Sequence, residues 1–516
     1  MSINKKTIRV ASEVGRLRKL LIHRPDGVIG RIIPEKAEEW LYDDIVFRDK
    51  MRWEYYHYVL LLLFFLDKAK IDEDIAKEKE SVILDFLETP FYLITEDAEK
   101  RERLYNFFNP NPMGKSNEYH NSKAVLDVMV LLRDLLDEEE YPGMKSTIVT
   151  SVCILEGISD RKRVELMQHD PKELVKTLIC GDELIKGRTG EERKHRTLFA
   201  PVPNLIFTRD IGVVTNDHIL ITNAAKRARQ RESLFVKYIF KYHNAFSGKD
   251  EVNENVLELA DDEVNLDKDL FFVQEAEETD KPKNLENEPK IAVEGGDVMM
   301  VNGKYILIGT SERTNAYAVK KIAKEVFERN TGIEKVISVQ IPKNRSSMHL
   351  DTIMTQVDRY DWVIYKPFIG DKPTKTTIYD KDNYNTKARI EKQTITQTIE
   401  REIYGAKAEK VRFIYCGNGE FPYDRREQWT DGANLVALMP GICIGYDRNT
   451  KTAEAFRDKG YEVFQAKKFL YHVIKNNLTA DDFVNKKALL LLPSGELSRA
   501  RGGSHCMSMP LFRDDL

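Results

Sequence analysis

The chain has 516 residues, of which 42% are hydrophobic, so it is long enough to bury a large core in about two to four compact units. Lys and Arg number 80 against 84 Asp and Glu, a formal net charge of −4 that provides no overall cationic field for nucleic acid. The composition therefore predicts a globular protein and argues against a nucleic-acid partner.

The first twelve residues are polar and basic, without the apolar stretch of a secretion signal. The longest apolar run, Val59 to Leu66, is far shorter than the roughly 20 residues that a bilayer requires. The five cysteines are an odd number without CxxC or His-rich spacing, which argues against a disulfide framework and a zinc site. We expect a cytoplasmic protein that neither spans a membrane nor uses a metal or cofactor.

One pattern recurs along the chain: an acidic residue, an apolar strand, a turn, a second apolar strand and a basic residue. Asp210 stands nine positions before Ile219, across the turn 216–217, and Asp297 stands nine before Ile306, across the turn 302–303. Looser copies run over residues 351–365 and 431–448, and we expect another at 13–25. Helical patterns such as 316–328 lie between them, which predicts an α/β fold of strand and helix units that gather the charged residues at a centre.

Two segments differ from this pattern. Residues from about 52 to 194 are rich in Leu, Glu and Lys with helical periodicity, clearest at Val125, Val128, Met129, Leu132, Leu135 and Leu136, and predict a helical insertion whose run 53–66 is helix core. Residues 247–290 are dominated by Asp, Glu, Asn and Lys and predict a solvated acidic insertion.

The candidate nucleophile is Cys506, which follows two glycines in RGGSHCMSMP that would let backbone approach a ligand closely. A nucleophilic thiol needs partners that move protons, and His349 in MHLD supplies a titratable imidazole. His349 and Asp351 stand two apart and would share a face if they lie on a strand.

Further carboxylates, Asp210 in NLIFTRD and Glu294 in EGGD, stand at corresponding places in the hairpin units. Paired carboxylates match the fork of a guanidinium, so the set suggests a pocket that clamps a planar cation. Arg229 and Arg313 each stand 19 positions after one of these acids, so each unit is expected to deliver one anion and one cation.

The order of several motifs resembles that of the arginine deiminases. The motifs are SEVGRLRKLLIHRPD, NLIFTRD, ARQRESLFVKYIF, VEGGDVMMV, GTSERT, MHLDT, REQWTDGANLVAL and RGGSHCMSMP. The resemblance runs from about Glu13 to Pro510 and implies a five-bladed pseudosymmetric α/β propeller, pentein-like, with an inserted α-helical domain. The parts would be residues 1–50, the helical domain 51–195, and the rest of the propeller, 196–516.

The resemblance also implies roles for individual residues. Cys506 would be the nucleophile, His349 the general acid and base, Asp210 and Asp351 the guanidinium ligands, and Glu294 an acid near His349. The positions implied for binding the substrate L-arginine are Asn204, Phe207, Arg229, Arg313 and Arg501. The resemblance further implies a cofactor-free hydrolase that forms citrulline through an amidino-cysteine and assembles as a dimer or tetramer.

Several alternatives remain open at this point. Amidinotransferases, agmatine deiminases and methylarginine hydrolases share Cys, His and acids, although Arg229, Arg313 and Arg501 argue against agmatine, which has no carboxylate. A cysteine peptidase would not need the excess acid. A non-catalytic arginine-binding regulator would not need the intact Cys506 and His349. The chain departs from the family pattern in extra residues at 367–410 and in Ile211 after Asp210, which leaves regulation and assembly open.

Overall fold

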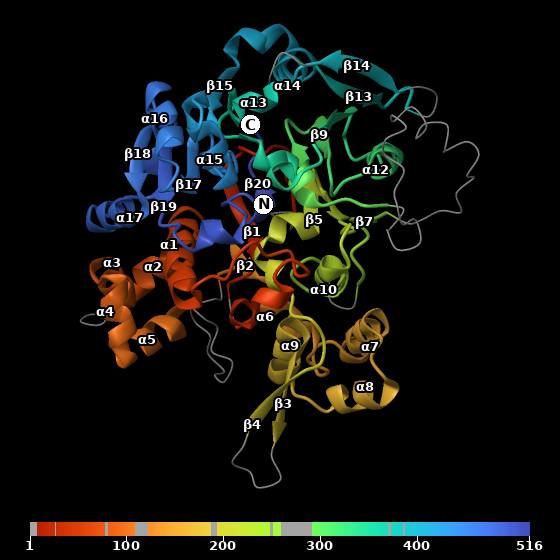
Figure 1. The fold of residues 1–516 in the computed structure, drawn as a ribbon, viewed down its shortest axis with the longest axis vertical. Helices are drawn as coiled ribbons and strands as arrows, with labels where there is room; N and C mark the ends of the chain where they lie inside the picture. Colours follow the sequence, from red (N-terminus) through yellow and green to blue (C-terminus); the bar gives the residue numbers. More distant parts are fainter. Residues whose placement is uncertain are drawn as a thin grey trace, which may run out of the picture.

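The computed structural model describes residues 8–25, 27–77, 81–108, 122–186, 193–247, 251–259, 291–369, 373–384 and 388–516. It is a mixed α/β structure in which short sheets surround the centre and helices cover the outside (Figure 1). In that part of the chain, no helix is long and apolar enough to cross a membrane.

Five sheets of the described residues repeat one arrangement, an antiparallel strand pair whose second strand pairs in parallel with a third. In chain order the trios are β5 (Gly212–Thr215), β6 (His218–Ile221) and β7 (Val256–Glu258); β8 (Val298–Met300), β9 (Tyr305–Thr310) and β10 (Lys335–Gln340); β11 (Met354–Gln356), β12 (Asp361–Ile364) and β15 (Arg412–Tyr415); β16 (Val436–Met439), β17 (Ile442–Tyr446) and β19 (Ala488–Leu492); and β20 (Met509–Arg513), β1 (Leu17–Ile22) and β2 (Val125–Asp127). The hairpins predicted at 210–221, 297–308, 351–365 and 431–448 are therefore confirmed.

Turn chemistry and burial explain these hairpins. Asn216 and Gly303 take positive φ values of 51° and 76° between their strands, a conformation that Asn and Gly adopt at low cost. The parallel third strand β19 reads as a continuous apolar run because both of its faces are covered, and all five of its residues are buried.

Helices fill the parallel crossovers. They are α10 (Gln230–Tyr242) before β7, α12 (Ala316–Glu328) before β10, α13 (Lys366–Ile369) and α14 (Ile395–Thr398) before β15, and α16 (Thr450–Asp458) and α17 (Ala466–Lys475), separated by β18 (Glu462–Gln465), before β19. Helix α15 (Tyr423–Trp429) connects β15 to β16. Strands β13 (Thr374–Asp380) and β14 (Arg389–Gln393), from the extra segment 367–410, extend the sheet of β10.

The predicted repeat at 13–25 is wrong as a hairpin. Strand β1 pairs antiparallel with β20 at the other end of the chain, with Leu20 opposite Pro510, so the fifth trio is assembled from both termini. Arg9 also pairs with the backbone of Leu511, and the two ends lie side by side. The loop that carries Cys506 thereby lies directly before the N-terminal end of β20, as the acidic residues lie before the first strands of other trios.

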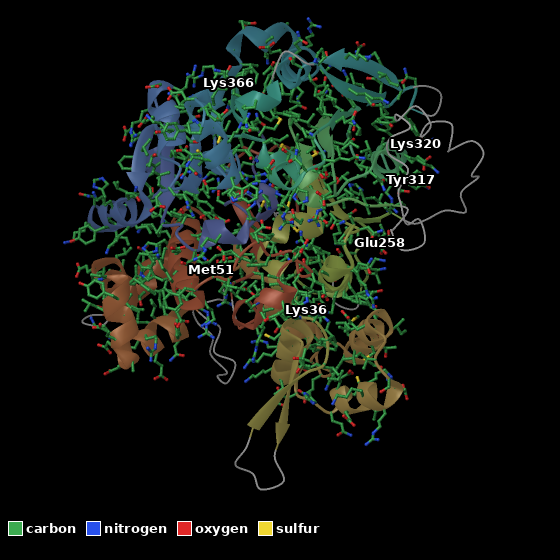
Figure 2. All side chains as sticks on the ribbon, in the orientation of Figure 1. Lys36, Met51, Glu258, Tyr317, Lys320 and Lys366 are labelled. Atoms are coloured by element: carbon green, nitrogen blue, oxygen red, sulfur yellow. The ribbon has the colours of Figure 1, made fainter. Side chains whose placement is uncertain are left out.

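The segment predicted to be helical contains α1 (Arg48–Leu66), α2 (Lys68–Ile75), α3 (Val82–Glu88), α4 (Phe91–Glu96), α5 (Ala98–Phe108), α6 (Val128–Leu135), α7 (Met144–Glu156), α8 (Asp160–Met167) and α9 (Pro171–Cys180). Helix α1 is buried on nearly all sides, which confirms 53–66 as helix core, and Met51 on it is fully buried (Figure 2). Val125, predicted to be helical, lies instead in β2, which pairs with β1. A hairpin of β3 (Asp182–Lys186) and β4 (Arg193–Thr197) ends the segment.

The acidic stretch at 247–290 is only partly described. Strand β7, at Val256–Glu258, lies inside it and pairs in parallel with β6, so this portion belongs to a sheet, contrary to expectation. Residues 248–250 and 260–290 lie outside the described residues.

Candidate active site

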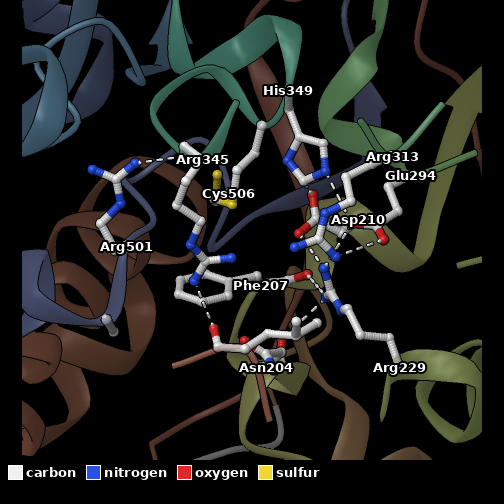
Figure 3. A pocket seen from close by; sticks show the side chains of 13 residues that line it. Asn204, Phe207, Asp210, Arg229, Glu294, Arg313, Arg345, His349, Arg501 and Cys506 are labelled. Atoms are coloured by element: carbon white, nitrogen blue, oxygen red, sulfur yellow. Dashed lines mark hydrogen bonds and ion pairs between the residues drawn. The ribbon is translucent and has the colours of Figure 1, made fainter. Parts of the chain in front are cut away.

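A cavity opens among the loops that precede the first strands of the trios. It brings together nine of the ten predicted site residues: Asn204, Phe207, Asp210, Arg229, Glu294, Arg313, His349, Arg501 and Cys506 (Figure 3). Leu41, Arg345, Met348 and Ala500 complete its lining. The tenth predicted residue, Asp351, lies beside Cys506 and hydrogen-bonds to it.

Short 3-10 turns immediately before the strands carry the acidic residues. Asp210 lies in the turn Thr208–Ile211 and Asp351 in the turn Leu350–Thr352, while Glu294 caps the turn Gly295–Asp297. The first and second turns along the chain pack against each other, as do the second and third. These three trios thus place their acidic residues toward the same central point, as the repeat predicted.

His349 and Asp351 do not share a strand face. His349 precedes the 3-10 turn that contains Asp351, and the two side chains have different partners. His349 Nε2 lies 2.9 Å from Glu294 Oε2 and its Nδ1 lies 3.7 Å from Asp210 Oδ1, whereas Asp351 faces Cys506. The two side chains therefore face different partners.

The environment of His349 favours the imidazolium. Burial opposes its charge, but Asp210 and the hydrogen bond to Glu294 outweigh burial and raise the pKa of His349 to about 10. Burial likewise opposes the charge of Glu294, yet His349, Arg229 and Arg313 hold the pKa of Glu294 well below its usual range. At neutral pH His349 and Glu294 therefore form an ion pair, and the imidazolium of His349 carries a proton that it can donate.

Arg229 is held by three carboxylates. Its Nη1 lies 2.5 Å from Asp210 Oδ2 and 3.2 Å from Glu294 Oε2, and its Nε lies 2.9 Å from Glu232 Oε2 (Figure 3). Although burial disfavours the cation, these charges raise the pKa of Arg229 well above its usual value. Arg313 pairs more loosely, with Nη1 3.5 Å from Glu294 Oε1. Each predicted acid thus has its predicted arginine beside it.

Three of the predicted acids each have one buried carboxylate oxygen that accepts no hydrogen bond from the described residues, namely Asp210 Oδ1, Glu294 Oε1 and Asp351 Oδ1. A buried acceptor without a donor costs free energy, on the order of 1–3 kcal/mol, so such atoms mark a place where a ligand is expected to donate. Asp210 and Glu294 line the cavity and Asp351 lies beside Cys506. A guanidinium supplies several N–H donors in one plane.

Cys506 lies at the floor of the cavity and is 4% exposed. Its thiol donates a hydrogen bond to Asp351 Oδ2 across 3.4 Å. Asn434 binds Cys506 twice, since Asn434 Nδ2 donates to Sγ and Asn434 Oδ1 accepts from the Cys506 backbone amide, both at 3.1 Å. Burial, together with Asp351 and Asp210, raises the pKa of the thiol well above its usual value. The resting group is therefore a neutral thiol.

Arg501 lines one side of the cavity. It adopts a left-handed backbone with φ of 62°, an uncommon conformation for a residue other than glycine that often marks functional sites. Its guanidinium stacks 3.5 Å from the centre of the Trp429 ring and donates to the carbonyls of Trp429 and Arg345. Its Nε lies 3.4 Å from Asp43 Oδ2 and donates no hydrogen bond to the described residues.

Asn204 and Phe207 also line the cavity. Asn204 Nδ2 donates to the carbonyl of Trp40 at 2.6 Å, which fixes its amide. The Phe207 ring packs directly on Gly502, where an added Cβ would lie only 2.2 Å from a ring carbon. Gly502 thus permits the contact between the Phe207 loop and the Cys506 loop.

The sequence pattern did not single out Glu232, Asn434 or Arg345. Asn434 lies within the motif TDGANLVAL and Glu232 within ARQRESLF, so both stood inside motifs that had been recognised for other reasons. The contact of Asn434 with Cys506 joins residues 72 positions apart and depends on the tertiary structure. Glu232 lies only three positions after Arg229, so its ion pair with Arg229 is a local contact.

Asp210, Glu294 and His349 could together face a cation, since one ligand atom from each lies within 4.8 Å of the others. Arg229 Nη1 already contacts both carboxylates, and the imidazole between them favours its protonated form. Protein side chains thus supply positive charge at this point, and these residues do not fit a metal ion well.

Comparisons with known proteins agree with one another. The sequence model of the family described as arginine deiminase matches residues 137–268 and 272–513. The arginine deiminase of Borreliella afzelii (strain PKo) is 28% identical over 521 residues, covering 99% of this chain and 98% of that protein. The arginine deiminase of Bacillus cytotoxicus is 28% identical over 515 residues, covering 99% of this chain and 100% of that protein.

Solved structures give more distant similarities. A dimethylarginine dimethylaminohydrolase, in its adduct with 4-chloro-2-hydroxymethylpyridine, is 15% identical with a TM-score of 0.33 over 60% of this chain and 78% of that chain. The N-terminal domain of a cyanobacterial arginine dihydrolase bound to product is also 15% identical, with a TM-score of 0.33 over 60% of this chain and 76% of that chain.

Proposed function

Because the chain belongs to the arginine deiminase family, which makes it a hydrolase of arginine, we propose that it converts free L-arginine and water to L-citrulline and ammonia through a covalent amidino-cysteine at Cys506. The observation that carries this mechanism is the meeting of a buried thiol and an imidazolium at one cavity, with three unsatisfied carboxylate oxygens from Asp210 and Glu294 in its lining and from Asp351 beside the thiol. A guanidinium satisfies those oxygens and presents its central carbon to the thiol.

The substrate guanidinium would lie between Asp210 Oδ1 and Asp351 Oδ1, with Glu294 Oε1 at its edge. Arg313 and Arg501, whose Nε atoms donate no hydrogen bond to the described residues, would hold the α-carboxylate by charge-assisted contacts. Asn204, Phe207 and Arg229 would shape the rest of the site. This arrangement favours an amino acid over agmatine, which has no carboxylate.

In the first half-reaction the cationic substrate lowers the pKa of the Cys506 thiol, which loses its proton to water. The thiolate forms an S–C bond to the central guanidinium carbon. The His349 imidazolium donates its proton to one NH₂ group, and the C–N bond breaks, which releases ammonia and leaves a cationic amidino-cysteine with neutral His349.

In the second half-reaction a water molecule donates a proton to neutral His349 and adds its oxygen to the amidino carbon. The C–S bond then breaks, the hydroxyl proton passes to the departing sulfur, and citrulline leaves. The thiol and the imidazolium are restored, and the proton lost from Cys506 is taken up by ammonia. The carboxylates stabilise positive charge throughout, in a site that excludes bulk water.

We also propose the finer architecture. The five repeated strand trios support a five-bladed α/β propeller formed by residues 1–50 and 196–516, closed by the pairing of β20 with β1. Residues 51–195 would form the inserted, mostly helical domain, from which β2 returns to the first blade.

For its setting, we propose a cytoplasmic homo-oligomer, a dimer or tetramer. All five cysteines are free in the described part of the chain, and free thiols are typical of a reducing compartment. Light scattering during size-exclusion chromatography measures the mass of the assembly directly.

The decisive test compares Cys506→Ala with Cys153→Ala, a buried cysteine in α7. We expect the first variant to form no citrulline while still binding arginine, and the second to behave as the unchanged protein. Assays with arginine, agmatine, methylarginine and an amidine acceptor separate the deiminase from its relatives. Unimpaired turnover by Cys506→Ala, or a preference for another substrate, would contradict the proposal.

A further inference from the structure

A row of buried charged side chains lies behind the candidate nucleophile. Glu13, Arg209, His505 and Asp351 are each no more than 3% exposed. They come from the segment before β1, from the turns before β5 and β11, and from the loop before β20. The row ends at Cys506, whose thiol lies 3.4 Å from Asp351 Oδ2.

The contacts of His505 determine which ring nitrogen carries its proton. Arg209 Nη2 lies 2.9 Å from His505 Nε2, and a guanidinium offers only donors, so Nε2 must accept. The proton of the neutral ring is then on Nδ1, which lies 2.9 Å from Asp351 Oδ2 and donates to it. Glu13 Oε2 is a weaker competitor for a proton on Nε2, at 3.4 Å.

Glu13 in turn fixes Arg209. Glu13 Oε2 accepts from Arg209 Nη2 at 2.7 Å, and Oε1 accepts from the backbone amide of Met300 in β8 at 3.2 Å. Arg513 and Tyr58 also face this cluster, and Arg513 donates to the carbonyl of Gly15 at 2.7 Å. The guanidinium of Arg209 is thereby held against His505 by groups on several elements.

In this row the two carboxylate oxygens of Asp351 have different hydrogen-bond partners. Oδ2 accepts both the His505 Nδ1–H and the Cys506 thiol, while Oδ1 accepts no hydrogen bond from the described residues. Burial opposes ionisation of Asp351, but the hydrogen bond from His505 lowers the pKa of this carboxyl, so it stays charged.

We propose that His505, held by Glu13 and Arg209 as the neutral Nδ1–H tautomer, is a positioning residue for the reaction, because it orients Asp351 so that one oxygen receives the substrate guanidinium and the other faces the nucleophile. The inference rests on the proposed function for its catalytic meaning. Its structural part, the tautomer, does not depend on any activity.

The test uses two amide substitutions that each keep one half of the imidazole. In His505→Asn the side-chain NH₂ stands near the position of Nδ1 and can still donate to Asp351. In His505→Gln the amide reaches the position of Nε2 and keeps only the contact with Arg209. We expect His505→Asn to retain kcat within about 10-fold, and His505→Gln to lose about 100-fold, the cost of a misplacement of about 1 Å, with a raised KM for arginine.

Two measurements distinguish the positioning role of His505 from a role in packing alone. The pH dependence of Cys506 alkylation should change in His505→Gln and not in His505→Asn, since only the first frees Asp351. Long-range nitrogen–proton spectra of the unchanged full-length protein with labelled histidine should show His505 protonated at Nδ1, and Arg209→Gln should abolish that preference. Equal kinetics in the two amide variants, or a His505 protonated at Nε2, would overturn the inference.

The outcomes separate this inference from the proposed function. If the unchanged protein forms no citrulline from arginine, the proposed function fails, while the alkylation profiles and the tautomer still decide the role of His505. If citrulline forms and Nδ1 is not the protonated nitrogen, only the present inference fails.

Discussion

Arg229 Nη1 lies 2.5 Å from Asp210 Oδ2, so an arginine of the protein occupies one oxygen of a carboxylate proposed to bind the substrate. The other oxygen, Oδ1, has no hydrogen bond from the described residues. A substrate guanidinium can therefore bind Asp210 without displacing Arg229. The same internal cation lets the protein bury Asp210, Glu294 and Glu232 together.

Arg229→Gln should strongly destabilise the protein, since it removes the cation shared by three buried carboxylates. Loss of one partner from a buried ion pair typically costs about 3–5 kcal/mol. Urea denaturation of the variant measures this against Arg227→Gln, which changes an exposed arginine in the same turn and should have little effect. Equal stability of the two variants would show that the carboxylates are protonated or solvated.

Gly296→Ala should impair turnover while leaving the fold intact. An added Cβ would lie 2.8 Å from His349 Nδ1 and 2.9 Å from Asp210 Oδ1, so the imidazole and the carboxylate must move apart. Displacements of this size typically cost about 100-fold in rate. Gly27→Ala is the matched control, because its Cβ meets only Cys180 Sγ at 3.8 Å, and citrulline formation should then be unchanged.

Local sequence patterns predicted much of this molecule. The hairpins after Asp210 and Asp297 depend on alternating burial and on turn residues within about a dozen positions, which a sequence displays directly. The predicted acids Asp210, Glu294 and Asp351 converge because each stands in or beside the short turn before a strand, and the resemblance to a family supplied the roles of the site residues.

Contacts between distant parts of the chain could not be predicted in this way. The pairing of β1 with β20 joins the two ends of the chain, and β2 has only three residues, too few to show a period. Glu13, Arg209 and His505 are likewise unremarkable until the fold brings them together. In sequence, a lone buried charge looks the same as a surface charge.

Arg501→Ala should raise the KM for arginine by about 10- to 100-fold, the effect of losing a charge-assisted hydrogen bond to the substrate carboxylate. The residual activity toward agmatine, which has no carboxylate, should not change. Arg499→Ala serves as control, because Arg499 pairs with Asp44 on the surface. An equal loss with both substrates would place Arg501 elsewhere in the reaction.

Asp351→Asn should make Cys506 more reactive without substrate, while turnover falls. After burial, Asp351 is the strongest influence that raises the pKa of this thiol, so removing its charge shifts the thiol pKa downward. Iodoacetamide alkylation, followed by mass spectrometry to identify the modified cysteine, should be faster at pH 8 than in the unchanged protein. Slower alkylation would mean that Asp351 accepts the thiol proton and activates the sulfur.

The stability contributed by His349 should depend on pH in one direction. Its folded pKa of about 10 lies above the roughly 6.5 expected in the unfolded chain, so the imidazolium stabilises the fold fully below pH 6.5. That contribution is lost as the pH rises from about 6.5 to about 10, where the folded ring also loses its proton. His349→Asn should therefore cost on the order of 3 kcal/mol of unfolding free energy at pH 6 and much less at pH 10. Denaturant titrations of both proteins at the two values measure the difference, and a gap that widens with pH would mean that the neutral ring is the stabilising form.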